Sequence, residues 1–194
     1  PERLVCDMHP GYLSTQWAER QAAKYGLFLT KVQHHHAHIA AVMAEHALDP
    51  GESVLGFAFD GTGYGTDGAI WGGEVLVANA TSAARVWHLA EVPLAGGDAA
   101  IRNPYRVALA HLVATGLRWS DDLAPVRQLD RVERGLLERQ LATGFNCVST
   151  TSMGRLFDGV ASLLDLRHRI SFEAQAAIDL ELAAERSSAT DVGF

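Results

Sequence analysis

The sequence predicts an α/β fold in which a mixed sheet is flanked by helices and the C-terminal half is mainly helical. Two strand-then-helix pairs open the chain, and two β-rich segments joined by a glycine-rich bend follow them. After about residue 100 the apolar residues recur at helical spacing. With 48% hydrophobic and 20% charged residues, the 194 residues can bury a sizeable core. We therefore expect one domain, or one domain with part of another.

The first strand-helix pair occupies the first 26 residues. Leu4–Cys6 is a short apolar run typical of a buried strand. Ser14 is a plausible N-cap for a helix that carries Trp17 and Ala18 on its apolar face, and Gly26 is a typical helix stop. The chain therefore begins as a strand followed by a helix.

The second pair repeats this order. Leu27–Gln33 is rich in β-formers and alternates loosely, which predicts a strand. In His34–Leu48, alanine, isoleucine, valine and methionine stand at helical spacing, and Asp49-Pro50-Gly51 ends the pattern. A second strand and a second helix should follow the first two.

The next segments read as a hairpin. Ser53–Asp60 is an apolar run that ends in an acid, Gly61–Gly68 is a glycine-rich loop, and Ala69–Asn79 resumes β character. Val86–Leu94 has the composition of one more strand. The sheet therefore extends to about residue 94.

Beyond the hairpin region the pattern becomes helical. Four segments are predicted as helices: Asn103–Thr115, Leu129–Thr143, Arg155–Leu166 and Phe172–Glu185. The polar stretch Trp119–Gln128 is the nearest thing to a linker, and Ser187–Phe194 carries no helical pattern.

Composition narrows the class of protein. Acidic residues outnumber basic ones by 23 to 16, which argues against a nucleic-acid partner. Two cysteines, Cys6 and Cys147, cannot form a dense disulfide framework, and we interpret both as structural. No apolar run reaches the length of a membrane span, and the N-terminus lacks a signal-peptide pattern. We expect a cytoplasmic protein without a membrane partner, and a piece of a longer polypeptide because the chain opens within a strand without Met.

Four histidines stand within five positions at the start of the second predicted helix. His34 and His38 are four residues apart, hence about 40° of net rotation and about 6 Å of rise, so both imidazoles can reach one ion. His35 and His36 should point elsewhere. Asp60, at a strand end, is a candidate third ligand. The alternative is a set of surface or hydrogen-bonded structural histidines.

The glycine-rich loop is a candidate site for phosphate. Glycines let the backbone present N–H groups to an anion with no side chain in the way. The loop is neither a Walker loop nor a Rossmann turn, and the alternative is an ordinary hairpin with β-bulges. The candidate nucleotide- or phosphate-binding residues are Gly61, Thr62, Gly63, Tyr64, Gly65 and Asp67, the last of which could also orient a nucleotide-bound cation.

Three arginines are candidates for recognising a substrate phosphate or carboxylate. Arg102 and Arg106 stand beside a proline and a tyrosine, and Arg155 lies between Ser152 and an apolar helix. The alternatives are a solvated helix start for the first two and a capped helix entrance for the third.

Several motifs in one order give the chain a family resemblance. The sequence resembles the C-terminal part of the HypF carbamoyltransferase family, which matures nickel-iron hydrogenases, from about residue 4 to residue 185. The motifs are CDMHPGYLST (6–15), VQHHHAHIAAVMAEH (32–46), FDGTGYGTDGAIWGGE (59–74), GGDAAIRNPYRVA (96–108), TSMGRLFDGVASLL (151–164) and FEAQAAIDLE (172–181).

This resemblance implies a two-lobed fold of the actin, sugar kinase and Hsp70 class, similar to the tRNA threonylcarbamoyl-transfer domain. Residues 1–52 would end the first lobe with the His-x-x-x-His helix, and residues 53–194 would begin a second lobe that is mostly helical here and incomplete. The resemblance maps metal ligands onto His34, His38 and Asp60, and a phosphate cradle onto Gly61, Gly63 and Gly65.

The resemblance also implies a reaction. The family makes carbamoyl adenylate from carbamoyl phosphate and ATP, with Mg²⁺ accompanying the nucleotide, and passes the carbamoyl group to the C-terminal cysteine of the partner HypE for cyanide ligand synthesis. The metal would be a divalent or trivalent ion, iron or zinc. Alternatives are an O-carbamoyltransferase of antibiotic biosynthesis, a tRNA threonylcarbamoyltransferase, and a noncatalytic fragment.

Overall fold

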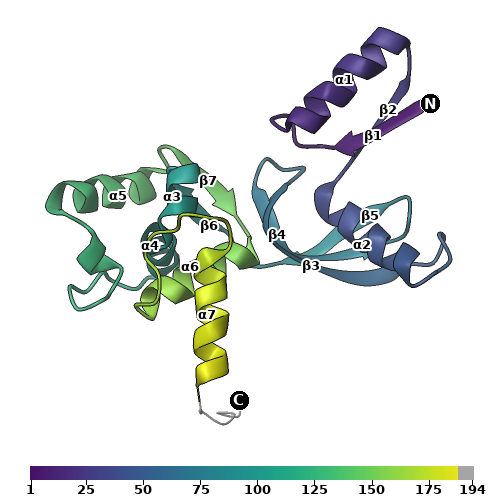
Figure 1. Cartoon of the computed structure of the whole chain (residues 1–194). Helices are drawn as coiled ribbons and strands as arrows, with labels where there is room; N and C mark the ends of the chain where they lie inside the picture. The colour runs from purple at the N-terminus through teal and green to yellow at the C-terminus, as the bar shows by residue number, and fades with distance from the viewer. Residues whose placement is uncertain (188–194) are drawn as a thin grey trace. The chain divides into compact units, whose positions relative to one another are not determined.

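The computed structural model describes residues 1–187 and divides into two compact units, Pro1–Ala90 and the residues from Glu91 onward (Figure 1). The predicted α/β class is confirmed, with parallel and antiparallel strand pairs and flanking helices. Of the last predicted segment, Ser187–Phe194, only Ser187 lies within the described residues. Within residues 1–187, no helix is long and apolar enough to span a membrane.

The first unit opens with strand β1 (Arg3–Asp7), helix α1 (Leu13–Tyr25) and strand β2 (Phe28–Val32). The two strands pair in parallel, which requires the crossover helix between them. Gly26 closes α1 in the left-handed conformation, with φ of 65°, as predicted. The predicted cap was wrong, because α1 begins before Ser14, at Leu13, and its N-cap residue Tyr12 makes no side-chain capping bond.

Helix α2 (His34–Glu45) carries the histidine cluster and ends three residues before the predicted Leu48. Its N-cap is Gln33, whose side chain accepts a hydrogen bond from the His36 N–H. The buried residues His35, Ile39 and Met43 are spaced by four, so they form one stripe along the helix. His34 and His38 lie one turn apart on the neighbouring stripe.

Three antiparallel strands complete the first unit: β3 (Val54–Tyr64), β4 (Ile70–Ala78) and β5 (Ala83–His88). The predicted loop Gly61–Gly68 is shorter than expected, because strand β3 continues through Tyr64 after a register shift between Phe59 and Gly63. Helix α2 packs on this sheet through a core of Ile39, Met43, Ala58, Ala69, Trp71, Leu76 and Ala78.

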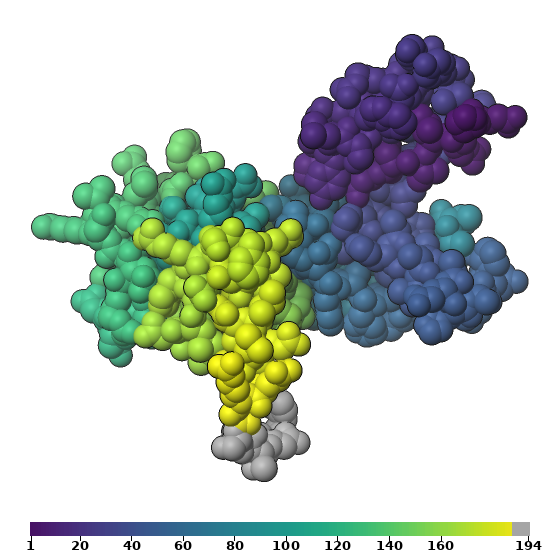
Figure 2. All heavy atoms as spheres, viewed as in Figure 1, coloured from purple at the N-terminus to yellow at the C-terminus, as the bar shows by residue number. Residues whose placement is uncertain are grey.

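The second unit is mainly helical, as predicted. Its elements are β6 (Val92–Ala95), α3 (Asp98–Arg102), α4 (Pro104–Ala114), the 3-10 turn η1 (Val126–Gln128), α5 (Arg131–Thr143), β7 (Cys147–Thr150), α6 (Met153–Leu163) and α7 (Gln175–Arg186). Strands β6 and β7 pair antiparallel. Figure 2 shows α7 standing out from the body of this unit.

Three expectations for the second half needed correction. The single strand predicted over Val86–Leu94 is divided between the end of β5 and the start of β6. Strand β7 was missed, because four residues are too short for a period of two to be recognised. The stretch Trp119–Gln128 is not a linker, since Val126 is buried in the core with Leu109 and Leu137.

Candidate metal centre

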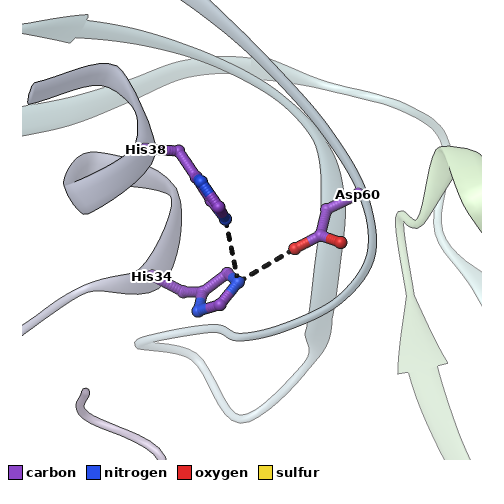
Figure 3. A group of neighbouring side chains, drawn as sticks. All are labelled: His34, His38 and Asp60. Carbon is purple, nitrogen blue, oxygen red and sulfur yellow. Dashed lines mark hydrogen bonds and ion pairs between the residues drawn. The ribbon is translucent and has the colours of Figure 1, made fainter. Parts of the chain in front are cut away.

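The side chains of His34, His38 and Asp60 converge (Figure 3). The His34 Nε2 atom lies 3.0 Å from Asp60 Oδ2 and 3.1 Å from His38 Nε2. One ligand atom from each residue lies within 4.8 Å of the other two. Helix α2 supplies both imidazoles and strand β3 supplies the carboxylate, so a helix-sheet contact assembles the cluster.

This donor set fits a transition-metal cation. A tetrahedral ion with ligands at about 2.0–2.1 Å places them about 3.3 Å from one another, close to the 3.0 and 3.1 Å distances from His34 Nε2 to its two partners. Two Nε2 atoms 3.1 Å apart can share one proton at most, whereas a cation satisfies both lone pairs. Two nitrogens and one oxygen suit iron or zinc and leave at least one coordination position open. The ion itself stays a prediction.

Solvent reaches the cluster. The side chains of His34 and Asp60 are 24% and 30% exposed, and His38 is exposed. A small substrate group could therefore approach an ion held by these three residues.

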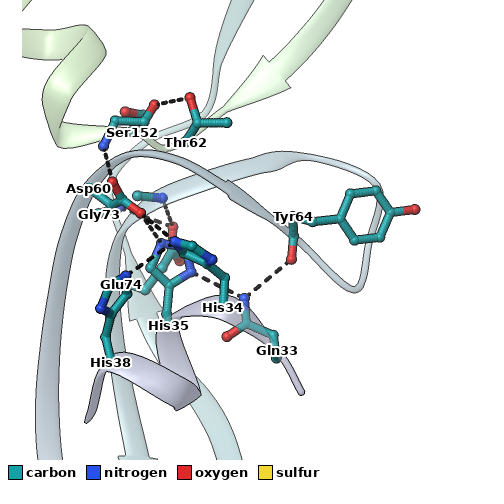
Figure 4. Close-up of polar contacts among 12 residues, drawn as sticks. Gln33, His34, His35, His38, Asp60, Thr62, Tyr64, Gly73, Glu74 and Ser152 are labelled. Atoms are coloured by element: carbon teal, nitrogen blue, oxygen red, sulfur yellow. Dashed lines mark hydrogen bonds and ion pairs between the residues drawn. The ribbon is translucent and has the colours of Figure 1, made fainter. Parts of the chain in front are cut away.

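His35 supports the cluster from the core side (Figure 4). Its side chain is fully buried, and its Nδ1 accepts a hydrogen bond from Gln33 Nε2 at 3.1 Å. The same Gln33 amide also donates to the Tyr64 carbonyl. Burial lowers the pKa of His35 to about 4 and outweighs the opposing charge of Asp60, so the ring is neutral at pH 7. Its Nε2 lies 3.8 Å from Asp60 Oδ2, which places it nearer the cluster than predicted.

His36 points away, as predicted. Its Nε2 donates a hydrogen bond to the Asn79 carbonyl at 2.7 Å, which ties the first turn of α2 to the end of β4. The histidine cluster thus contains two candidate ligands and two structural side chains.

Close packing accounts for two of the hairpin glycines. A Cβ added to Gly63 would lie 2.2 Å from His35 Cε1, and one added to Gly65 would lie 2.3 Å from Trp71 Nε1. Neither glycine has a positive φ, unlike Gly68 at 84°. The Gly61 N–H donates to Asp60 Oδ1 at 2.6 Å and so helps to hold the carboxylate. Phosphate binding by Gly61, Thr62, Gly63, Tyr64 and Gly65 stays a prediction.

Gly63→Ala is expected to destabilise the protein by about 1–3 kcal/mol, because the new methyl group overlaps the buried His35 ring. The displaced ring should also disturb Asp60 and weaken metal binding. Urea denaturation and a zinc titration would measure both effects. Gly135→Ala is the control, since a Cβ there meets nothing within 4 Å; equal effects of the two substitutions would contradict the packing argument.

A partly buried ion-pair network behind the hairpin was not predicted from the sequence. Arg85 donates from Nε to Glu74 Oε2 at 2.6 Å and from Nη1 to Asp67 Oδ2 at 2.9 Å. Its guanidinium lies 4.2 Å from the Trp71 ring centroid. Fully buried Glu74 also accepts the N–H groups of Gly72 and Gly73. Cross-strand register creates these contacts, and nothing in the local sequence signals them.

Asp67 belongs to this network. Burial raises the pKa of its carboxyl, but hydrogen bonds from Ala69 and Trp71 and the charge of Arg85 outweigh burial and hold the pKa below its usual value. The carboxylate is therefore engaged in holding the hairpin. Its assignment to nucleotide or cation binding stays a prediction.

The three candidate arginines differ in exposure. Arg102 is 72% exposed and 4.0 Å from Asp98, so it is accessible. Arg106 is largely buried, donates to Gln140 Oε1 at 3.2 Å and lies 3.6 Å from Glu133. Substrate binding by any of the three stays a prediction.

Arg155 is 4% exposed and pairs at 3.1 Å with Asp158, which is fully buried. Burial raises the pKa of Asp158 to about 6, although Arg155 opposes the shift. The predicted cap of this helix is present, since Ser152 Oγ accepts the Arg155 N–H. Arg155 is thus part of a buried ion pair within α6.

Comparison with protein families gives two adjacent matches. Residues 1–45 match the family described as HypF Kae1-like domain, and residues 56–194 match the family described as Carbamoyltransferase, Kae1-like Domain, second subdomain. The lobe boundary between residues 52 and 53 stays a prediction.

Individual proteins agree with these matches. Carbamoyltransferase HypF2 of Cupriavidus necator is 44% identical over 95% of this chain and 22% of its own length. The crystal structure of full-length HypF in the phosphate- and nucleotide-bound form has a TM-score of 0.82 and 45% identity, covering 93% of this chain and 23% of that one. HypF of T. kodakarensis has a TM-score of 0.86 and 36% identity, covering 100% of this chain and 26% of that one. The chain spans 22–48% of the length of its curated relatives.

Proposed function

Because the chain belongs to the Kae1-like domain family of the carbamoyltransferase HypF, we propose that it supplies the carbamoyl-transfer site of a larger hydrogenase-maturation enzyme. The observation that carries this proposal is the convergence of His34, His38 and Asp60 within 4.8 Å. The cluster is partly open to solvent and lies beside the glycine-rich strand.

The proposed reaction starts from carbamoyl adenylate, which carbamoyl phosphate and ATP would form, with Mg²⁺, elsewhere in the whole protein. The thiolate of a C-terminal cysteine, presented by a HypE-like partner, attacks the carbamoyl carbon. A sulfur–carbon bond forms, the carbon–oxygen bond to the phosphate breaks, AMP leaves, and the thiol proton passes to solvent. The product would be the precursor of the cyanide ligand.

His34, His38 and Asp60 would hold the cation so that its open coordination position faces solvent. A bound cation would polarise the carbamoyl carbonyl and offset the charge of the leaving phosphate. His35, neutral and buried, lies behind Asp60, with its Nε2 3.8 Å from Asp60 Oδ2.

An external nucleophile is consistent with the state of Cys147. Burial raises the pKa of the Cys147 thiol, and this effect outweighs the opposing charge of Arg106. Little thiolate is therefore present at pH 7. Its Sγ lies 3.5 Å from the Gln140 carbonyl, as expected of a structural thiol. The reactive thiol would therefore come from the partner.

The proposal is tested by mixing the protein with freshly prepared carbamoyl adenylate and a HypE-like acceptor, and measuring the acceptor by mass spectrometry. We expect the mass of one carbamoyl group to appear on the C-terminal cysteine, and no product with the His34→Ala/His38→Ala variant. Equal product with wild type and variant would overturn the role of the cluster.

Other acceptors separate the alternatives. Carbamoylation of a hydroxyl on an antibiotic precursor, or threonylcarbamoyl transfer to tRNA, in place of thiol transfer would favour the two related enzymes. A chain that binds metal but transfers to none of these acceptors would be a noncatalytic fragment.

A further inference from the structure

We propose that Asp7 is a positioning residue for the candidate metal ligand His34. Its Oδ2 lies 2.7 Å from His34 Nδ1, the ring nitrogen on the side away from the metal cluster. This inference rests on the metal centre of the proposed function, to which it adds a residue that the donor set does not contain.

The carboxylate of Asp7 is itself held in place. Its Oδ1 accepts the His9 N–H at 2.7 Å. The Thr15 hydroxyl donates to the Asp7 backbone carbonyl at 3.1 Å and not to the carboxylate. The Asp7 side chain is 18% exposed, so water competes little for it. Asp7 thus presents one fixed oxygen to His34.

Strand pairing brings Asp7 to His34. In the parallel register of β1 and β2, Asp7 lies opposite Val32, two residues before α2 begins. The chain therefore enters the histidine helix directly beside this carboxylate, although 27 residues separate the two side chains in sequence.

The contact favours one state of the ring. A carboxylate accepts only, so Asp7 favours a proton on Nδ1, which makes the Nε2 lone pair available to a cation held together with His38 and Asp60. A histidine ligand whose other nitrogen donates to a carboxylate is a common arrangement in metal sites, where it orients the ring and raises its basicity. Asp7 would do both for His34.

A metal titration tests the consequence. Asp7→Ala is expected to weaken zinc affinity on the order of 10- to 100-fold, and Asp7→Asn to weaken it less, because an amide oxygen can still accept from Nδ1. Cobalt substituted for zinc would report a changed ligand field in its visible spectrum. Thr15→Val is the matched control, since it removes the hydrogen bond to the Asp7 carbonyl and leaves the carboxylate untouched.

Affinities of all variants within twofold of wild type, with folding verified by thermal denaturation, would overturn the inference. A Thr15→Val loss as large as that of Asp7→Ala would also overturn it, because the effect would then come from general destabilisation.

A metal-free measurement keeps this inference separate from the proposed function. Nitrogen-15 NMR of the histidine rings at about pH 9 should show a larger Nδ1-protonated fraction of His34 in wild type than in Asp7→Ala, where only Asp60, on the Nε2 side, still accepts from the ring. The same tautomer fraction in both proteins would refute the role of Asp7. Absence of metal binding by wild type, with the expected tautomer change, would instead contradict the metal centre alone.

Discussion

Replacing both His34 and His38 by alanine is expected to abolish stoichiometric metal binding, with an affinity loss of more than about 100-fold. The double variant retains only Asp60 of the three converging ligands, and a single carboxylate competes poorly with water for a transition-metal ion. Plasma mass spectrometry on tag-free protein reconstituted with iron or zinc would measure the metal content.

His36→Ala is the matched control for this experiment. It removes an imidazole from the same turn of α2, but His36 binds the Asn79 carbonyl and lies outside the cluster. We expect its metal content to equal that of wild type. Equal metal in the double variant would exclude the predicted centre, and a wild-type protein that takes up neither ion would show that these three residues do not suffice.

Glu74→Ala is expected to lower the free energy of unfolding by about 3 kcal/mol. The substitution removes a fully buried carboxylate and leaves the 16% exposed Arg85 guanidinium with one fewer counter-charge, and breaking a buried pair typically costs about 3–5 kcal/mol. Asp67 still faces Arg85, which places the loss at the lower end of that range. Urea denaturation followed by circular dichroism would measure it.

Asp98→Ala removes a solvent-exposed ion pair and serves as the comparison for Glu74→Ala. Its carboxylate is 87% exposed and lies 4.0 Å from Arg102, so its loss should change the unfolding free energy by less than about 0.5 kcal/mol. Similar values for the two variants would refute a structural role for the buried network.

The histidine helix illustrates what could be predicted. Helical spacing placed His34 and His38 on one face, and α2 confirms that geometry because residues four apart adjoin in any α-helix. Asp60 was a candidate by its position at the end of an apolar run and by the family resemblance. The structure brings it to the histidines through the packing of α2 on β3.

The glycine-rich segment illustrates the limit of local patterns. Gly63 and Gly65 were interpreted by their backbone freedom, whereas the structure gives them a steric role against His35 and Trp71. Both partners are brought close by packing and by a register shift in β3, and neither follows from glycine content. Ser14 is not the cap, because the N-cap is Tyr12, two residues earlier, and Ser14 lies within the helix.

The sequence by itself determined the α/β class, most of the helices and strands, and the His-x-x-x-His pair, because these depend on periodicities of two and 3.6 residues. Only the tertiary structure decided that Asp7 faces His34 across 27 residues and that Arg85 pairs with Glu74 across 11. Strand register and helix-sheet packing fix these contacts. They arise from the joint burial of distant segments, which no local pattern of residues encodes.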